Sequence, residues 1–153
     1  MFLSHRNSSL VRARRLNRRG GAALELAVVF PILLLLIIGV ADYGRVFFTS
    51  ITVANAARAG AEYGAQSPAT SVDTVGMKLF AQADGNEVGS LTLAARYYCE
   101  CGGSANPSCT VCSGVAPDVF VEVTATKAVA MLFRYPGLQD TVTIVRKATF
   151  RSQ

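Results

Sequence analysis

One long apolar run, from Ala22 to Ala41, constrains this chain more than any other feature of its sequence. A helix of about 20 residues is roughly 30 Å long, which is the thickness of the hydrocarbon core of a bilayer. The run therefore predicts a membrane-spanning helix. Glu25 stands near its start, and an ionised side chain within a bilayer costs roughly 2.5–3.5 kcal/mol. A carboxylate at this place indicates a function.

The basic charge of the chain is concentrated before the apolar run. Of 15 Lys and Arg residues, six precede the run, and no acidic residue does: these are Arg6, Arg12, Arg14, Arg15, Arg18 and Arg19. The remainder is nearly neutral, so the charge gives no support to a nucleic-acid partner. Basic residues at one end of a span fix its orientation, so we expect a cytoplasmic leader over 1–20 and an exported part over 42–153.

Two other interpretations of the N-terminus stay open. A removable secretory signal has an apolar region of about 7–15 residues followed by a small-residue cleavage site. The run over 22–41 is longer, and the residues after it offer no good site of that kind. An uncleaved single-pass anchor is the stronger alternative.

The membrane-spanning helix, placed at 21–41, is expected to continue as an amphipathic helix over 42–66. Apolar residues recur there at helical spacing: Tyr43, Val46, Phe47, Ile51, Ala54, Ala57, Ala61 and Ala65. Charged pairs at Asp42–Arg45 and Arg58–Glu62 have the spacing of weak helix-stabilising pairs. A break near Gly39 or Gly44 is the alternative. Pro31 removes one backbone donor and predicts a kink or a weak point within the span.

The exported part, 67–153, is expected to hold one short helix and a small sheet. The helix is placed at 72–84 with Ser71 as its cap, and its apolar face consists of Val72, Val75, Leu79, Phe80 and Ala83. Alternating residues predict strands at 91–101, 119–126 and 141–150. The fold class is therefore α+β, with a long N-terminal helix packed on a three-stranded antiparallel sheet, which needs such a cover to be stable.

The connection over 128–139 is too apolar for a solvated loop, since it contains Met131, Leu132, Phe133 and Tyr135. It either folds back onto the core, touches the membrane surface or meets a partner subunit. The sequence does not choose between the three.

Four cysteines lie close together in the segment CECGGSANPSCTVC: Cys99, Cys101, Cys109 and Cys112. Disulfides are favoured because the exported side is oxidising. The favoured pairing is Cys99–Cys112 with Cys101–Cys109, among three that are possible. A zinc site and a redox pair at Cys109 and Cys112 are the alternatives.

The sequence gives catalysis little support. The one histidine, His5, lies in the leader, so the exported part has no residue for a Ser-His-Asp or Cys-His site. No Gly-rich phosphate loop is present. We expect a protein that is not an enzyme and has no cofactor, no small-molecule substrate and no metal.

The spacing between Gly20 and Glu25 resembles the class III signal of type IV pilins. In those proteins a prepilin peptidase cuts after a glycine that follows a basic leader, and a Glu stands at position +5 of the mature chain. Cleavage between Gly20 and Gly21 gives Glu25 that position, whereas cleavage after Gly21 gives it position +4. The resemblance implies that Glu25 registers an incoming subunit by pairing with a free α-amine. The alternative is a Glu25 side chain that reaches back to the cytoplasmic interface.

The longer segment over 18–65 resembles the TadE family of Flp/Tad pilus proteins. The residues that carry the resemblance are Glu25, Pro31, Asp42, Tyr43, Gly44, Arg45, Ala57, Arg58 and Gly60. It implies a pilin-like fold and a pseudopilin or minor pilin anchored in the inner membrane. The implied partners are the prepilin peptidase, other pilin and pseudopilin subunits, Tad assembly proteins and membrane lipid.

Two other classes of function are alternatives to a pilus protein. One is an uncleaved membrane-anchored adhesin or a scaffold of a secretion complex. The other is a zinc or redox protein that uses the four cysteines.

Overall fold

The structure of the protein, a computed structural model, describes residues 19–152 apart from 107, 108, 110, 134–136 and 138. Most of the predicted leader and Tyr135 of the apolar connection therefore lie outside the described residues. The chain forms two compact units, 1–37 and 38–153, and each is described by itself.

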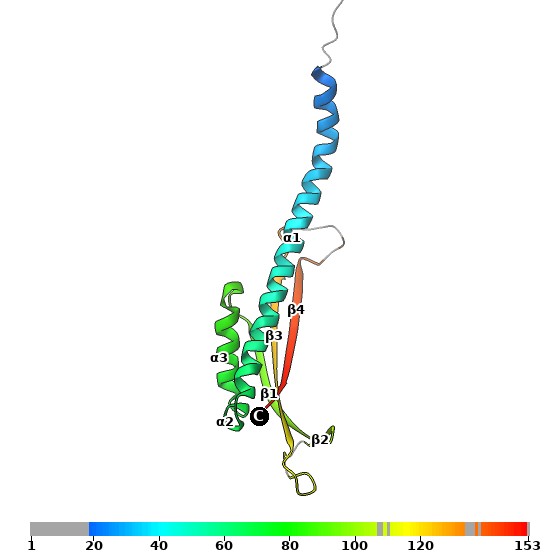
Figure 1. Ribbon diagram of the computed structural model, residues 1–153. Helices are drawn as coiled ribbons and strands as arrows, with labels where there is room; N and C mark the ends of the chain where they lie inside the picture. The colour runs from blue at the N-terminus through cyan, green and yellow to red at the C-terminus, as the bar shows by residue number, and fades with distance from the viewer. Residues whose placement is uncertain (1–18, 107–108, 110, 134–136, 138, 153) are drawn as a thin grey trace, which may run out of the picture. The chain divides into compact units, whose positions relative to one another are not determined.

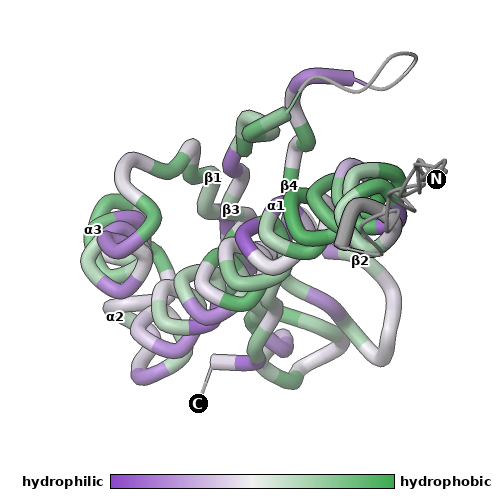
Figure 2. Tube along the Cα trace, turned by 90° about the horizontal axis from the view of Figure 1, so that it is seen from above, coloured by the Kyte–Doolittle hydropathy of each residue, from purple (hydrophilic) through white to green (hydrophobic). Residues whose placement is uncertain are grey.

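The first element is a single long helix, α1 (Arg19–Ala65). The helix is assigned without interruption through Pro31, Gly39 and Gly44, so the alternative of two helices is wrong. All residues from 21 to 37 are exposed. This part of α1 is hydrophobic almost throughout (green in Figure 2), and α1 is long and apolar enough to cross a membrane.

In the second unit, α1 buries only part of the face that the sequence predicts, since Ala57 and Ala61 are buried but the large apolar residues before them are not. The side chains of Tyr43, Phe47 and Ile51 are 71%, 56% and 47% exposed. The other buried residues of α1 are Val53, Ala56 and a set of polar residues and glycines: Asp42, Thr49, Thr52, Gly60 and Gly64. Apolar periodicity alone misses the members of that set because Gly, Thr and Asp do not count as apolar.

Two short helices follow α1. The first, α2 (Pro68–Ser71), has a capping box in which the Ser67 hydroxyl and the Thr70 side chain each accept from the other residue's backbone amide. The second, α3 (Thr74–Asp84), is capped by Asp73, whose carboxylate accepts from the amide of Gly76 at 2.9 Å. The prediction of a helix from 72 capped by Ser71 is therefore wrong at its start, since Ser71 ends α2. A 3-10 turn, η1 (Gly85–Val88), ends this region.

The predicted apolar face of α3 also points away from the core. Gly76, Met77 and Ala81 are buried, while four large apolar side chains are between 52% and 66% exposed: Val72, Val75, Leu79 and Phe80. The reason is steric. Gly60 and Gly64 of α1 leave room for a close approach, and Met77 fills that room.

The sheet has four antiparallel strands in the order β2-β1-β3-β4, one more than predicted. They are β1 (Thr92–Cys101), β2 (Ser104–Asn106), β3 (Asp118–Ala130) and β4 (Thr141–Arg151). The additional strand β2 forms because Gly102 and Gly103 both have positive φ, 59° and 84°. Two such residues make the tight hairpin turn that lets the chain return at once along β1.

Helices α1 and α3 cover one face of this sheet (Figure 1), as the sequence predicts for the long helix. Val53 and Ala57 of α1 pack with Ala125 and Ile144, and Met77 of α3 packs with Val121 and Val123. The other face carries Arg96, Glu122 and Lys147, and both basic side chains contact Glu122. The structure thus confirms an α+β architecture and corrects its strand number.

Candidate functional site

Asp42, the first residue after the apolar run, is almost fully buried, with 2% of its surface exposed. Its Oδ1 atom accepts a hydrogen bond from the backbone amide of Leu132 at 2.8 Å, and its Oδ2 atom accepts one from Phe133 at 3.3 Å. Residues 131–140 connect β3 to β4, so this carboxylate ties α1 to the β3–β4 connection. Buried polar groups need such partners, and here each side satisfies the other.

The neighbours of Asp42 in the motif face outward. Tyr43 is 71% exposed and its ring stacks on Phe47 with 6.3 Å between centroids. Arg45 lies 3.9 Å from the Asp42 carboxylate, half exposed. A Cβ atom at Gly44 would meet nothing within 4 Å, so no packing contact within the described chain requires glycine there.

The second half of the motif belongs to the core. Ala57 is 1% exposed. A Cβ atom at Gly60 would lie 2.5 Å from the backbone oxygen of Met77, so only glycine fits between α1 and α3. The Ala/Gly-rich stretch of α1 therefore admits a close neighbour, and that neighbour is α3. Arg58 and Glu62 are both exposed, and the described residues show no ion pair between them, contrary to the prediction.

The predicted processing and registration residues lie in the first unit. Gly20 and Gly21 are in the first turns of α1, and Glu25 is exposed. No hydrogen bond or ion pair joins Glu25 to a residue within the described part of the chain. Pro31 lies inside α1, where it leaves the carbonyl of Ala27 without its usual amide donor. These residues and Asp42 belong to different units of the chain.

All four cysteines form disulfides, as predicted, but the favoured pairing is wrong. The bonds are Cys99–Cys109 and Cys101–Cys112, with Cα atoms 5.1 and 5.6 Å apart. The predicted pairing, Cys99–Cys112 with Cys101–Cys109, would enclose one bond within the loop of the other. The early hairpin instead places Asn106 opposite Cys99, and the amide of Cys109 donates to the Asn106 carbonyl at 3.2 Å. This hydrogen bond places Cys109 beside Asn106 and hence beside Cys99.

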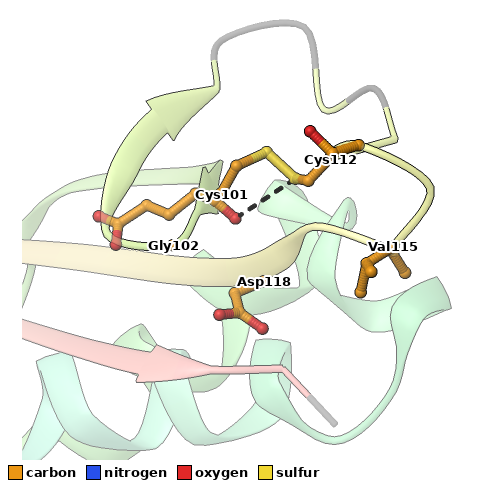
Figure 3. A pocket seen from close by; sticks show the side chains of 8 residues that line it. Cys101, Gly102, Cys112, Val115 and Asp118 are labelled. Atoms are coloured by element: carbon orange, nitrogen blue, oxygen red, sulfur yellow. Dashed lines mark hydrogen bonds between the residues drawn. A yellow bond between two sulfur atoms is a disulfide. The ribbon is translucent and has the colours of Figure 1, made fainter.

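The second disulfide borders a shallow pocket at the end of the sheet, shown in Figure 3. The Cys112 sulfur lies 3.9 Å from the carbonyl oxygen of Glu100. A disulfide sulfur carries no proton, so this dashed line marks a contact rather than a donated hydrogen bond. Oxidised sulfurs also supply no thiolate for zinc, which binds cysteine as S⁻. The arrangement serves as a covalent staple of the β1–β2 end of the sheet.

Glu122 is an ionic centre that sequence reasoning missed, because an isolated acid in a strand is usually solvated. It is 7% exposed. Arg96 donates two hydrogen bonds to its carboxylate, at 2.7 and 3.0 Å, and Lys147 donates a third at 2.8 Å. The hydrogen bonds from Arg96 and Lys147 hold the pKa of Glu122 below its usual value, against the effect of burial. Only the strand register, which sets Arg96 opposite Glu122, reveals the cluster.

A second carboxylate fixes α3 to α1. The Tyr63 hydroxyl donates to Asp73 Oδ2 at 2.9 Å, while Oδ1 caps α3 through Gly76. The amide of Gly76, and then the hydroxyl of Tyr63, lower the pKa of Asp73, and the same Tyr63 bond raises the pKa of the tyrosine. The sequence contained a signal for this cap, because Asp73 stands immediately before the helical residues.

Comparison with known protein families gives a match within α1. The sequence model of the family described as TadE-like protein matches residues 20–62. The match runs from the predicted cleavage site through Asp42 to Glu62, and it confirms the resemblance based on the motifs. No curated protein and no solved structure matches the chain significantly.

Proposed function

We propose that this protein is a TadE-like pseudopilin or minor pilin of a Flp/Tad-type pilus, anchored in the inner membrane and matured by a prepilin peptidase after Gly20. The observation that carries the proposal is the TadE-like match over residues 20–62, which starts at the predicted cleavage site. That segment holds the helix that is apolar enough to span a membrane.

The role proposed for Glu25 is supported by its surroundings. Its carboxylate is exposed on the apolar part of α1 and has no partner within the described residues. An unpaired charge in lipid is costly, so a partner from another subunit stabilises it. The α-amine that cleavage creates at Gly21 is a cation of the right charge at the end of an adjoining helix.

The second unit has two exposed apolar surfaces that could contact other subunits. One is the outer face of α1, formed by Tyr43, Phe47 and Ile51, and the other is the outer face of α3 around Leu79. Large exposed apolar surfaces commonly mark interaction sites. Gly44, which no packing contact within the described chain explains, lies beside Tyr43 and permits close approach of a neighbouring helix.

The N-terminus of the mature protein tests the proposal. Mass spectrometry of the protein from its native membrane is expected to find a chain that begins at Gly21, and Gly20→Ala is expected to block processing. Gly44→Ala, which leaves the signal intact, is the matched control. A chain with an intact leader in the membrane fraction would favour the uncleaved adhesin or scaffold instead.

Assembly is tested separately through Glu25. Glu25→Ala is expected to insert into the membrane normally, since it removes a charge from the apolar run, yet to abolish or strongly reduce piliation. Glu25→Gln keeps the size of the side chain and is expected to share the defect, because it cannot pair with an amine as a charge. Wild-type piliation of both variants would leave only the interpretation that Glu25 reaches the lipid interface.

A further inference from the structure

The start of the β3–β4 connection lies at the level of α1 where the apolar run ends. Ala41 is the last residue of that run, and Asp42, the next residue of the same helix, binds the amides of Leu132 and Phe133. One residue of α-helix rises about 1.5 Å. These two loop residues are therefore fixed at the height where a helix that spans a bilayer leaves the hydrocarbon.

Apolar side chains are exposed on two sides of the helix at this level. Val40 and Tyr43 on α1 are each 71% exposed, and Leu132 and Phe133 are 60% and 47% exposed. The loop residues are held on the Asp42 side of α1, and Val40 lies on the opposite side because two residues in a helix are about 200° apart. A single partner protein covers one side, whereas a lipid surface meets both. Tyrosine is also typical of membrane–water interfaces.

The burial of Asp42 fits the same location. Backbone amides that enter a region poor in water must find a partner within the protein. Asp42 supplies one for each of two successive amides, and the carboxylate itself is only 2% exposed. The pair of bonds lets the backbone of Leu132 and Phe133 lie at a membrane surface with both amides satisfied.

We propose that Leu132 and Phe133 insert among the lipid headgroups and form a second membrane contact beside α1. Of the three locations that the sequence allows for the connection, this proposal favours the membrane surface. It rests on the membrane-spanning helix and does not require that the protein enter a pilus.

The test uses the absence of tryptophan from the chain. Leu132→Trp places one fluorescent reporter in the connection. Val115→Trp is the matched control, since Val115 is 67% exposed and lies at the opposite end of β3, about 40 Å along the strand. The full chain carrying each substitution is reconstituted in phosphatidylcholine vesicles, with and without bromine on the acyl chains near the headgroup.

Brominated lipid is expected to quench the emission of Leu132→Trp, and the emission maximum is expected at a shorter wavelength than that of Val115→Trp, which stays unquenched. Adding Asp42→Ala to Leu132→Trp is expected to reduce the quenching, because the connection is then released. Three results would overturn the proposal: emission of Leu132→Trp equal to the control, equal quenching of both, or a Leu132→Trp shielded from acrylamide but not quenched by lipid. The last would indicate a protein partner.

Discussion

Asp42 and Leu132 are 90 residues apart in sequence, and the Asp42 carboxylate accepts the Leu132 amide at 2.8 Å. The bond joins the end of the apolar run to the start of the β3–β4 connection. It therefore fixes the start of the β3–β4 connection against the part of α1 where the apolar run ends.

Replacing Asp42 tests this coupling. Asp42→Ala leaves two amides without a partner, and we expect it to lower the free energy of unfolding by roughly 1.5–3 kcal/mol, as for hydrogen bonds to charged groups. Urea unfolding of the full chain in detergent measures the change. Arg45→Ala is the control, because its exposed pair at 3.9 Å contributes at most about 1 kcal/mol. Equal effects of the two variants would contradict the role of the Leu132 and Phe133 amides.

Two glycines of α1 are expected to respond oppositely to alanine. At Gly60 a methyl group meets the backbone of Met77, so Gly60→Ala is expected to destabilise by about 1–3 kcal/mol. At Gly44 nothing lies within 4 Å, so Gly44→Ala is expected to stabilise the isolated chain by about 0.5–1 kcal/mol. Thermal unfolding in detergent compares them. A Gly60→Ala chain as stable as the parent would show that α1 and α3 do not pack closely.

The stability of the second unit is expected to fall in acid through Glu122. Hydrogen bonds from Arg96 and Lys147 lower the pKa of this carboxyl in the folded protein relative to the unfolded chain. The stabilisation is therefore fully present above the unfolded value of about 4.3 and is lost as the pH falls through the lower folded pKa. Urea midpoints between pH 7 and pH 2 measure it, and Glu122→Gln is expected to flatten the dependence. Asp73, with its lowered pKa, supplies a parallel contribution that Asp73→Asn removes.

The disulfide pairing is testable with paired serine substitutions. Cys99→Ser with Cys109→Ser is expected to leave Cys101–Cys112 oxidised, so alkylation without reductant labels no thiol. Cys99→Ser with Cys112→Ser breaks both native bonds and is expected to expose two thiols. Loops of about 10 residues predict a loss of about 2–3 kcal/mol for each missing bond. Two labelled thiols in the first double variant and none in the second would instead support the pairing Cys99–Cys112 with Cys101–Cys109.

The sequence alone identified the features that depend on local composition. A long apolar run predicts a spanning helix whatever it packs against, and the alternation of Val119 to Thr124 predicts a strand. The TadE-like match, the disulfides and the α+β class follow from such local patterns. The strand β2 is not predicted by the sequence because its three residues are too few to show an alternating pattern.

The tertiary structure decided which faces meet. Close packing of α1 and α3 depends on the space left by Gly60 and Gly64, and hydropathy does not register such space, so both helices expose most of the large apolar residues that periodicity assigned to the core. The partners of Asp42 and Glu122 come from other strands or from a connection far along the chain. Their identity depends on register and on the path of the backbone, which no short stretch of sequence contains.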